Sequence, residues 1–76
     1  MNQLSKYEAI DKTNNLNIIN IRYYMNDINA TYETCLQWRD KFIKYLNEDY
    51  NQTGSSYREC VDVFNKFYWL PNNAIK

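Results

Sequence analysis

Hydrophobic and polar positions follow a helical period most clearly over residues 31–50, TYETCLQWRDKFIKYLNEDY. At about 100° per residue, the apolar side chains gather on one side of a helical wheel, and the charged and amide side chains fall mostly on the other. The predicted core stripe consists of Tyr32, Cys35, Leu36, Phe42, Ile43, Leu46 and Tyr50. This pattern predicts a long amphipathic helix whose first turn is capped by the hydroxyl of Thr31.

Two large aromatic residues, Trp38 and Tyr45, lie on the shoulder of this stripe, seven positions apart. The favoured interpretation is that they pack beneath the N-terminal segment, because large aromatic side chains at helical spacing usually belong to a core. The alternative is that they stay exposed and anchor a partner protein. Periodicity alone leaves both interpretations open.

Two shorter segments begin with a capping box, in which a Ser side chain and a Glu side chain three residues later each bond the other's free backbone N–H. The first box pairs Ser5 with Glu8 and predicts a short helix that breaks at the turn-forming residues 13–15. The second box pairs Ser56 with Glu59 and predicts the start of the last helix.

The last helix is expected to follow a loop at residues 51–55 and to end at Pro71, which lacks a backbone N–H. Its predicted core stripe consists of Tyr57, Cys60, Val61, Phe64, Phe67 and Tyr68. Its polar side consists of Arg58, Glu59, Asp62, Asn65 and Lys66. Three more apolar residues lie off the stripe, namely Val63, Trp69 and Leu70.

Residues 16–28, LNIINIRYYMNDI, fit either a helix or a strand. Enrichment in β-branched and aromatic residues favours a strand. The helix is the preferred interpretation, because the segment is longer than a usual strand and no second strand-like segment exists to pair with it.

Together these segments predict an all-α fold, a single domain over residues 1–76 with loose tails at 1–3 and 71–76. We expect a small three-helix bundle, or a four-element one if the capped N-terminal segment is counted. The last two helices should form an antiparallel hairpin, because a loop of about five residues allows little else. The first long segment would then pack across their shared groove.

The charge balance argues against nucleic acid as a partner. Nine basic and nine acidic residues give a formal charge of zero, whereas nucleic-acid binders need surplus Lys and Arg to displace counterions from phosphates. The loop before the last helix admits a dimeric helix-turn-helix regulator as an alternative. Against it, Glu59 and Asp62 on the outward face of that helix would oppose the phosphates.

The composition also argues against catalysis, cofactors and metals. The chain has no His, the commonest general base and metal ligand, and a single Gly, so it has no glycine-rich phosphate loop. Two cysteines alone cannot build a structural zinc site. Cys35 and Cys60 are out of register for a disulfide across the expected hairpin, which favours a reduced, cytoplasmic protein. No apolar run resembles a signal peptide or a membrane span.

A protein partner is the remaining candidate, because interfaces concentrate their energy in buried Trp, Tyr and Arg. The candidate partner-binding residues lie beyond the predicted core stripes: Trp38, Tyr45, Val63, Trp69 and Leu70. The sequence therefore predicts a small non-enzymatic protein-binding module that inhibits or regulates a larger protein. Its abundant Asn, Ile, Lys and Tyr suggest an AT-rich genome, such as that of a phage or virus acting in the host cytoplasm. A structural homodimer that pairs through Leu16, Ile19 and Tyr23 is the other alternative.

Overall fold

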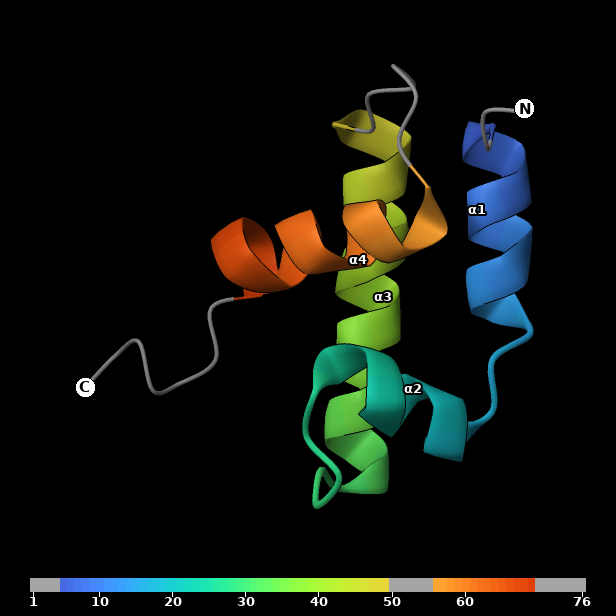
Figure 1. Cartoon of the computed structure of the whole chain (residues 1–76). Helices are drawn as coiled ribbons and strands as arrows, with labels where there is room; N and C mark the ends of the chain where they lie inside the picture. Colours follow the sequence, from blue (N-terminus) through green and yellow to red (C-terminus); the bar gives the residue numbers. More distant parts are fainter. Residues whose placement is uncertain (1–4, 50–55, 70–76) are drawn as a thin grey trace.

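The computed structural model describes residues 5–49 and 56–69, which form α-helices and one π-helical segment, with no strand among them (Figure 1). The elements are α1 (Lys6–Asn14), α2 (Ile18–Met25), α3 (Tyr32–Glu48), α4 (Tyr57–Phe64) and the π-helix η1 (Asn65–Trp69). The predicted all-α bundle is confirmed, and residues 16–28 contribute a helix rather than a strand. The predictions for the tails, for the loop at 51–55 and for Tyr50, Leu70 and Pro71 lie outside the described residues.

The helix starts follow from local chemistry that the sequence displays. The Ser5 hydroxyl accepts a hydrogen bond from the Glu8 N–H at 3.0 Å, and the Glu8 carboxylate accepts one from the Ser5 N–H at 2.8 Å. Ser56 and Glu59 form the same reciprocal pair at 3.2 Å in each direction. Both predicted capping boxes are confirmed. Each satisfies backbone donors that have no partner within the first turn of their own helix.

A tight turn between α2 and α3 reverses the chain. Asn26 ends α2 in the left-handed conformation, with φ of 65°, which Asn tolerates better than most residues. The Arg22 Nε–H donates to the Ala30 carbonyl oxygen at 2.9 Å and so closes the turn from inside. This turn directs α3 back past α2, so that both helices bury side chains against each other.

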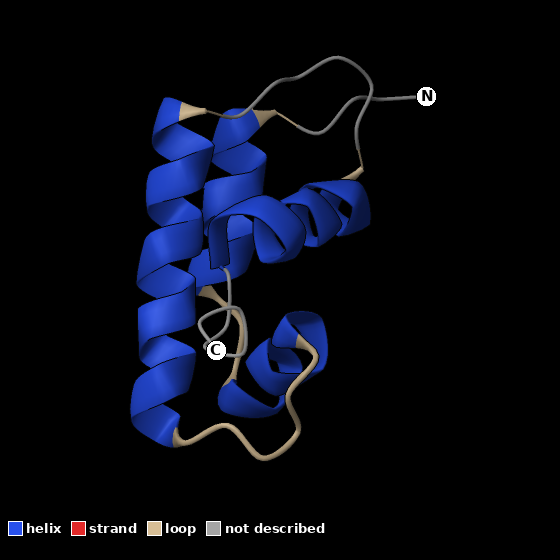
Figure 2. Cartoon of the chain, turned by 90° about the vertical axis from the view of Figure 1, so that its left-hand side faces the viewer, coloured by secondary structure: helices blue, strands red, loops and turns tan. Residues whose placement is uncertain are grey.

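Helix α3 is the centre around which the other elements pack. Helix α1 runs alongside it, and α2 packs near its N-terminal end (Figures 1 and 2). Helix α4 and η1 follow α3 in the chain and pack on its other half, crossing it at a steep inclination in both views. Four elements, α1, α2, α4 and η1, therefore cover α3, so its buried arc is wider than a single stripe.

The core face of α3 is rotated toward the predicted shoulder. Trp38 is 0% exposed and Tyr45 is also buried, whereas Tyr32, predicted to be core, is 63% exposed. The alternative in which Trp38 and Tyr45 are exposed anchors is therefore wrong. Both rings pack against α4, since the Phe64 ring lies 5.6 Å from each of them.

Aromatic rings form the centre of the core. The Phe42 ring lies 5.0 Å from those of Trp38 and Phe64, 5.8 Å from that of Tyr57 and 5.9 Å from that of Tyr45. Rings at these separations gain attraction beyond the area they bury. Cys35 and Cys60 are buried beside this cluster as thiols.

A buried hydrogen bond joins α1 to α4. The Thr13 hydroxyl donates to the Ala9 carbonyl oxygen and lies 2.8 Å from the Tyr57 hydroxyl, so the Tyr57 hydroxyl is the donor to Thr13. Burial raises the pKa of Tyr57 from 10.0 to about 12. The folded chain thus favours the neutral phenol more strongly than the unfolded chain does.

This pKa shift predicts a loss of stability in alkali. The contribution of Tyr57 is fully present below its ordinary pKa of 10.0 and is lost as the pH rises to about 12. We expect Tyr57→Phe to cost about 1 kcal/mol at neutral pH through the lost hydrogen bond. The difference in unfolding free energy between Tyr57→Phe and the wild type should shrink as the pH rises from 10.0 to about 12. Urea unfolding of both proteins across the range measures it, and a difference independent of pH would contradict the assignment.

Candidate protein-binding surface

The last helix changes its geometry after Phe64, and this change exposes two aromatic residues. In a π-helix each N–H bonds the carbonyl five residues earlier, so the α-helical periodicity assumed for the sequence no longer applies. Phe67 is 62% exposed and Tyr68 45% exposed. The prediction that both belong to the core stripe is therefore wrong, whereas Tyr57, Cys60, Val61 and Phe64 are buried as expected.

Asn65 fixes the junction between α4 and η1. Its side-chain oxygen accepts a hydrogen bond from the Trp38 indole N–H at 2.8 Å, and its amide nitrogen donates to the Tyr24 carbonyl oxygen at 2.8 Å. One side chain thereby connects η1 to α3 and to α2. Because both bonds are partly buried, they hold the π-helical segment in a defined position on the bundle.

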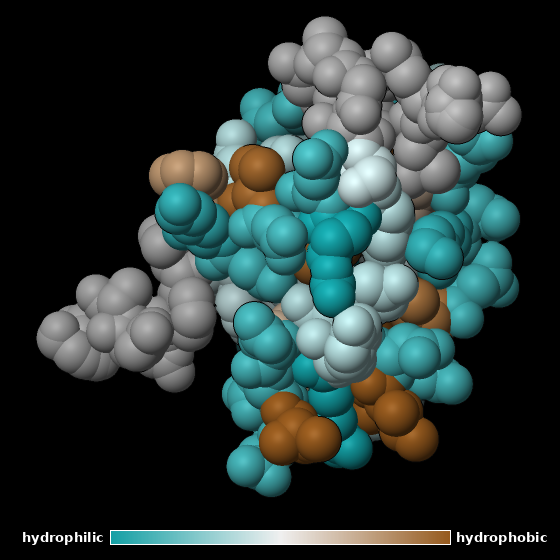
Figure 3. Space-filling model, in the orientation of Figure 1, coloured by the Kyte–Doolittle hydropathy of each residue, from teal (hydrophilic) through white to brown (hydrophobic). Residues whose placement is uncertain are grey.

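What we call the η1 surface consists of Phe67 and Trp69 on η1 together with Val63 near the end of α4. Val63 is 41% exposed, and Trp69 is half-buried, with its ring stacked 6.5 Å from that of Phe64. Lysine side chains accompany both rings: Lys66 Nζ lies 5.5 Å from the Phe67 ring centroid, and Lys41 Nζ lies 5.6 Å from that of Trp69. Figure 3 shows hydrophobic side chains beside hydrophilic ones on the left of the molecule, where Figure 1 places the end of the last helix.

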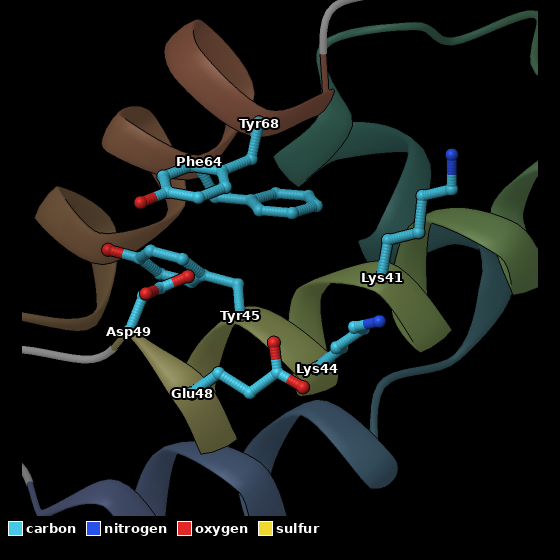
Figure 4. A pocket seen from close by; sticks show the side chains of 7 residues that line it. All are labelled: Lys41, Lys44, Tyr45, Glu48, Asp49, Phe64 and Tyr68. Carbon is cyan, nitrogen blue, oxygen red and sulfur yellow. The ribbon is translucent and has the colours of Figure 1, made fainter.

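A groove of about 220 Å³ separates η1 from the C-terminal half of α3 (Figure 4). Tyr45, Phe64 and Tyr68 form its aromatic floor, with the Tyr45 and Tyr68 rings 4.6 Å apart. Burial, and after it the charges of Cys60, Tyr68 and Asp49, raise the pKa of Tyr45. The groove is smaller than typical enclosed ligand pockets of about 300–1,000 Å³, and it suits a side chain of a docking protein better than a small molecule.

Four charged side chains rim this groove: Lys41, Lys44, Glu48 and Asp49. All four are exposed to solvent. Within residues 5–49 and 56–69, no group of three or more His, Cys, Asp or Glu side chains is placed to hold a metal ion. Because the four rim side chains are exposed, they can make ion pairs with a docked protein.

The structure divides the five residues that the sequence singled out. Trp38 and Tyr45 lie in the core, Val63 is exposed near the end of α4, Trp69 is half-buried on η1, and Leu70 lies outside the described residues. Sequence reasoning missed Phe67 and Tyr68, because an α-helical wheel places them on the buried side. No signal in the sequence marks the switch to π-helical geometry.

The outward face of α4 is largely engaged within the chain. Arg58 donates from its guanidinium to the Tyr23 hydroxyl at 2.9 Å and stacks over the Tyr23 ring at 5.1 Å. Glu59 is held by its capping box, and Asn65 by its bonds to Trp38 and Tyr24. A DNA-reading helix would direct such side chains outward. Only Asp62 and Lys66 of this set make none of these contacts within the described part of the chain, and their opposite charges give no net positive charge to attract phosphates.

The surface of α2 is a second exposed apolar region. Ile19 and Tyr23 are exposed, whereas Leu16 is half-buried and packs against the core. The three residues proposed for a structural homodimer are thus not equally accessible. Tyr23 is in addition held by Arg58, so it is less available to a partner than its exposure suggests.

Comparison with known proteins gives no match, since no family model, no curated protein and no solved structure is significantly similar to this chain. Among the described helices, none is both long enough and apolar enough to cross a bilayer.

Proposed function

We propose that this chain is a small non-enzymatic protein-binding module that contacts a larger protein through the η1 surface. The observation that carries the proposal is the exposure of Phe67 on a π-helical segment that Asn65 holds in place. Exposing a large aromatic ring to water costs free energy unless a partner covers it. π-Helical segments are also found frequently at functional sites.

The environment of the surface supports a protein as the partner. Lys66 lies over the Phe67 ring and Lys41 over the Trp69 ring, so each aromatic group is accompanied by a cation. Aromatic side chains that supply the contact area and a polar rim that excludes water are the usual anatomy of an interface. The amino-acid bias toward Asn, Ile, Lys and Tyr extends the proposal to a phage or viral inhibitor or regulator of a host protein.

Capture of a partner should depend on the η1 surface. We expect Phe67→Ala and Trp69→Ala each to reduce the amount of partner captured from host lysate by about tenfold, because hot-spot truncations cost roughly 1–2 kcal/mol or more. Quantitative mass spectrometry of the captured proteins, with the far-UV circular dichroism of each variant, provides the measurement. The control is Tyr7→Ala, which removes an exposed ring from α1. Equal loss in the control would show that the effect is not specific to η1.

A further inference from the structure

The rim of the groove between α3 and η1 carries its charges in a fixed order. Lys41 and Lys44 come first along α3, and Glu48 and Asp49 follow. At about 1.5 Å of rise per residue, the two pairs are centred roughly 9 Å apart along the helix axis. Figure 4 shows Lys41 and Lys44 toward one end of the groove, Asp49 beside the Tyr45 ring toward the other, and Glu48 between them.

These charges have no ionic partners in the part of the chain that the structure describes. Lys44, Glu48 and Asp49 form no salt bridge there, and the Lys41 ammonium lies 5.6 Å from the centroid of the Trp69 ring. Asp40, the other acid in this half of α3, is exposed but does not line the groove. The groove therefore offers an aromatic floor between a positive end and a negative end.

We propose that a second copy of this chain docks in this groove, with the two α3 helices antiparallel across a two-fold axis that passes close to Tyr45. A two-fold axis reverses the charge order in the second copy. The midpoint between positions 41 and 49 in the helix is residue 45, and the midpoint between positions 44 and 48 is residue 46. One axis therefore places Lys41 opposite Asp49 and Lys44 opposite Glu48, and each contact is made twice because the interface is isologous.

The aromatic floor supplies the area, and the charges select the arrangement. Tyr68 is half-exposed above Tyr45 in each copy, and aromatic side chains dominate the energetics of interfaces. Ion pairs at an interface rim contribute little affinity, but like charges placed opposite each other reject the wrong orientation. A parallel pairing would place lysines against lysines, so the antiparallel arrangement is the one that the rim permits.

This pairing goes beyond the proposed binding of a larger protein, because it uses the groove rather than the η1 surface. Charge reversal tests it with the intact protein. The variant Lys41→Glu/Lys44→Glu carries acids at both ends of the groove, and the variant Glu48→Lys/Asp49→Lys carries bases at both ends. Each variant alone should self-associate at least about tenfold more weakly than the wild type, whereas an equimolar mixture should recover association.

Sedimentation equilibrium across the micromolar range measures the masses, and far-UV circular dichroism verifies that each variant is folded. Asp11→Lys/Asp40→Lys makes the same change in net charge as Glu48→Lys/Asp49→Lys, but away from the groove, and should leave dimerisation intact. A monomeric wild type throughout the range would overturn the proposal. So would dimers in both reversed variants, failure of the mixture to associate, or loss of the dimer on Ile19→Ser, which would place the contact on α2. Any of these results would leave the capture test of the η1 surface unaffected.

Discussion

Replacement of Trp38 by Ala is expected to abolish cooperative folding of this chain at room temperature. The side chain is fully buried, its ring lies 5.0 Å from that of Phe42, and its indole N–H is bonded to Asn65. Truncating a buried Trp to Ala costs about 3–5 kcal/mol, because the transfer free energy is lost and a cavity remains. A single core in a chain of 76 residues supplies only about 3–5 kcal/mol in total.

Far-UV circular dichroism during urea unfolding measures this effect. The matched control is Tyr32→Ala on the same helix, which should change the free energy of unfolding by less than about 0.5 kcal/mol because its ring is exposed. The two substitutions discriminate the observed core face from the one that periodicity predicted. Severe destabilisation by Tyr32→Ala together with tolerance of Trp38→Ala would contradict the observed core face and support the stripe predicted from periodicity.

Replacement of Asn65 by Leu should lower the free energy of unfolding by about 2–4 kcal/mol, because it leaves the Trp38 indole N–H and the Tyr24 carbonyl without a partner in a partly buried site. Asn20→Leu, at an exposed position on α2, is the control and should be nearly neutral. Urea unfolding of the two variants gives the comparison.

A double-mutant cycle separates the two hydrogen bonds of Asn65. Trp38→Phe removes the indole donor, so part of the cost of Asn65→Leu should disappear in that background, with a coupling free energy of about 0.5–3 kcal/mol. Strict additivity would mean that the bond between Trp38 and Asn65 does not contribute to stability. The same cycle tests whether Asn65 positions η1, because loss of the bond should also weaken partner capture.

The parts of this fold that the sequence predicts are those decided by neighbours in the chain. The bond of Ser5 with Glu8 and that of Ser56 with Glu59 depend on residues three positions apart. The end of α1 near residues 13–15 likewise follows from the turn-forming preference of Thr and Asn. The helix over residues 16–28 could be inferred from the absence of any second strand-like segment.

The parts that the sequence does not predict depend on how several elements share α3. A single helical wheel assumes one partner and one stripe, whereas α1, α2 and the α4–η1 arm all pack on α3. The buried arc therefore extends to Trp38 and Tyr45 and leaves Tyr32 in water. Phe67 and Tyr68 are misplaced for a different reason, since the wheel assumes α-helical geometry where the chain is π-helical.

The candidate surface was accordingly predicted in part. Val63 and Trp69 were identified because they lie off the core stripe, and the structure leaves Val63 exposed on α4 and Trp69 half-buried on η1. Phe67, the most exposed ring on η1, could be assigned only once the geometry of that segment was known. The order of the charged residues along α3 is visible in the sequence. That they rim a groove follows only from the structure, in which η1 forms the opposite wall.

The most direct test of the protein-binding proposal is the affinity of a purified, captured partner for the wild type and for Val63→Ser/Phe67→Ser. Isothermal titration calorimetry should show at least about thirtyfold weaker binding for the double variant, equivalent to roughly 2 kcal/mol. The variant should unfold at the same urea concentration as the wild type, because both side chains are exposed. An unchanged affinity in a stably folded variant would contradict the η1 surface as the binding site.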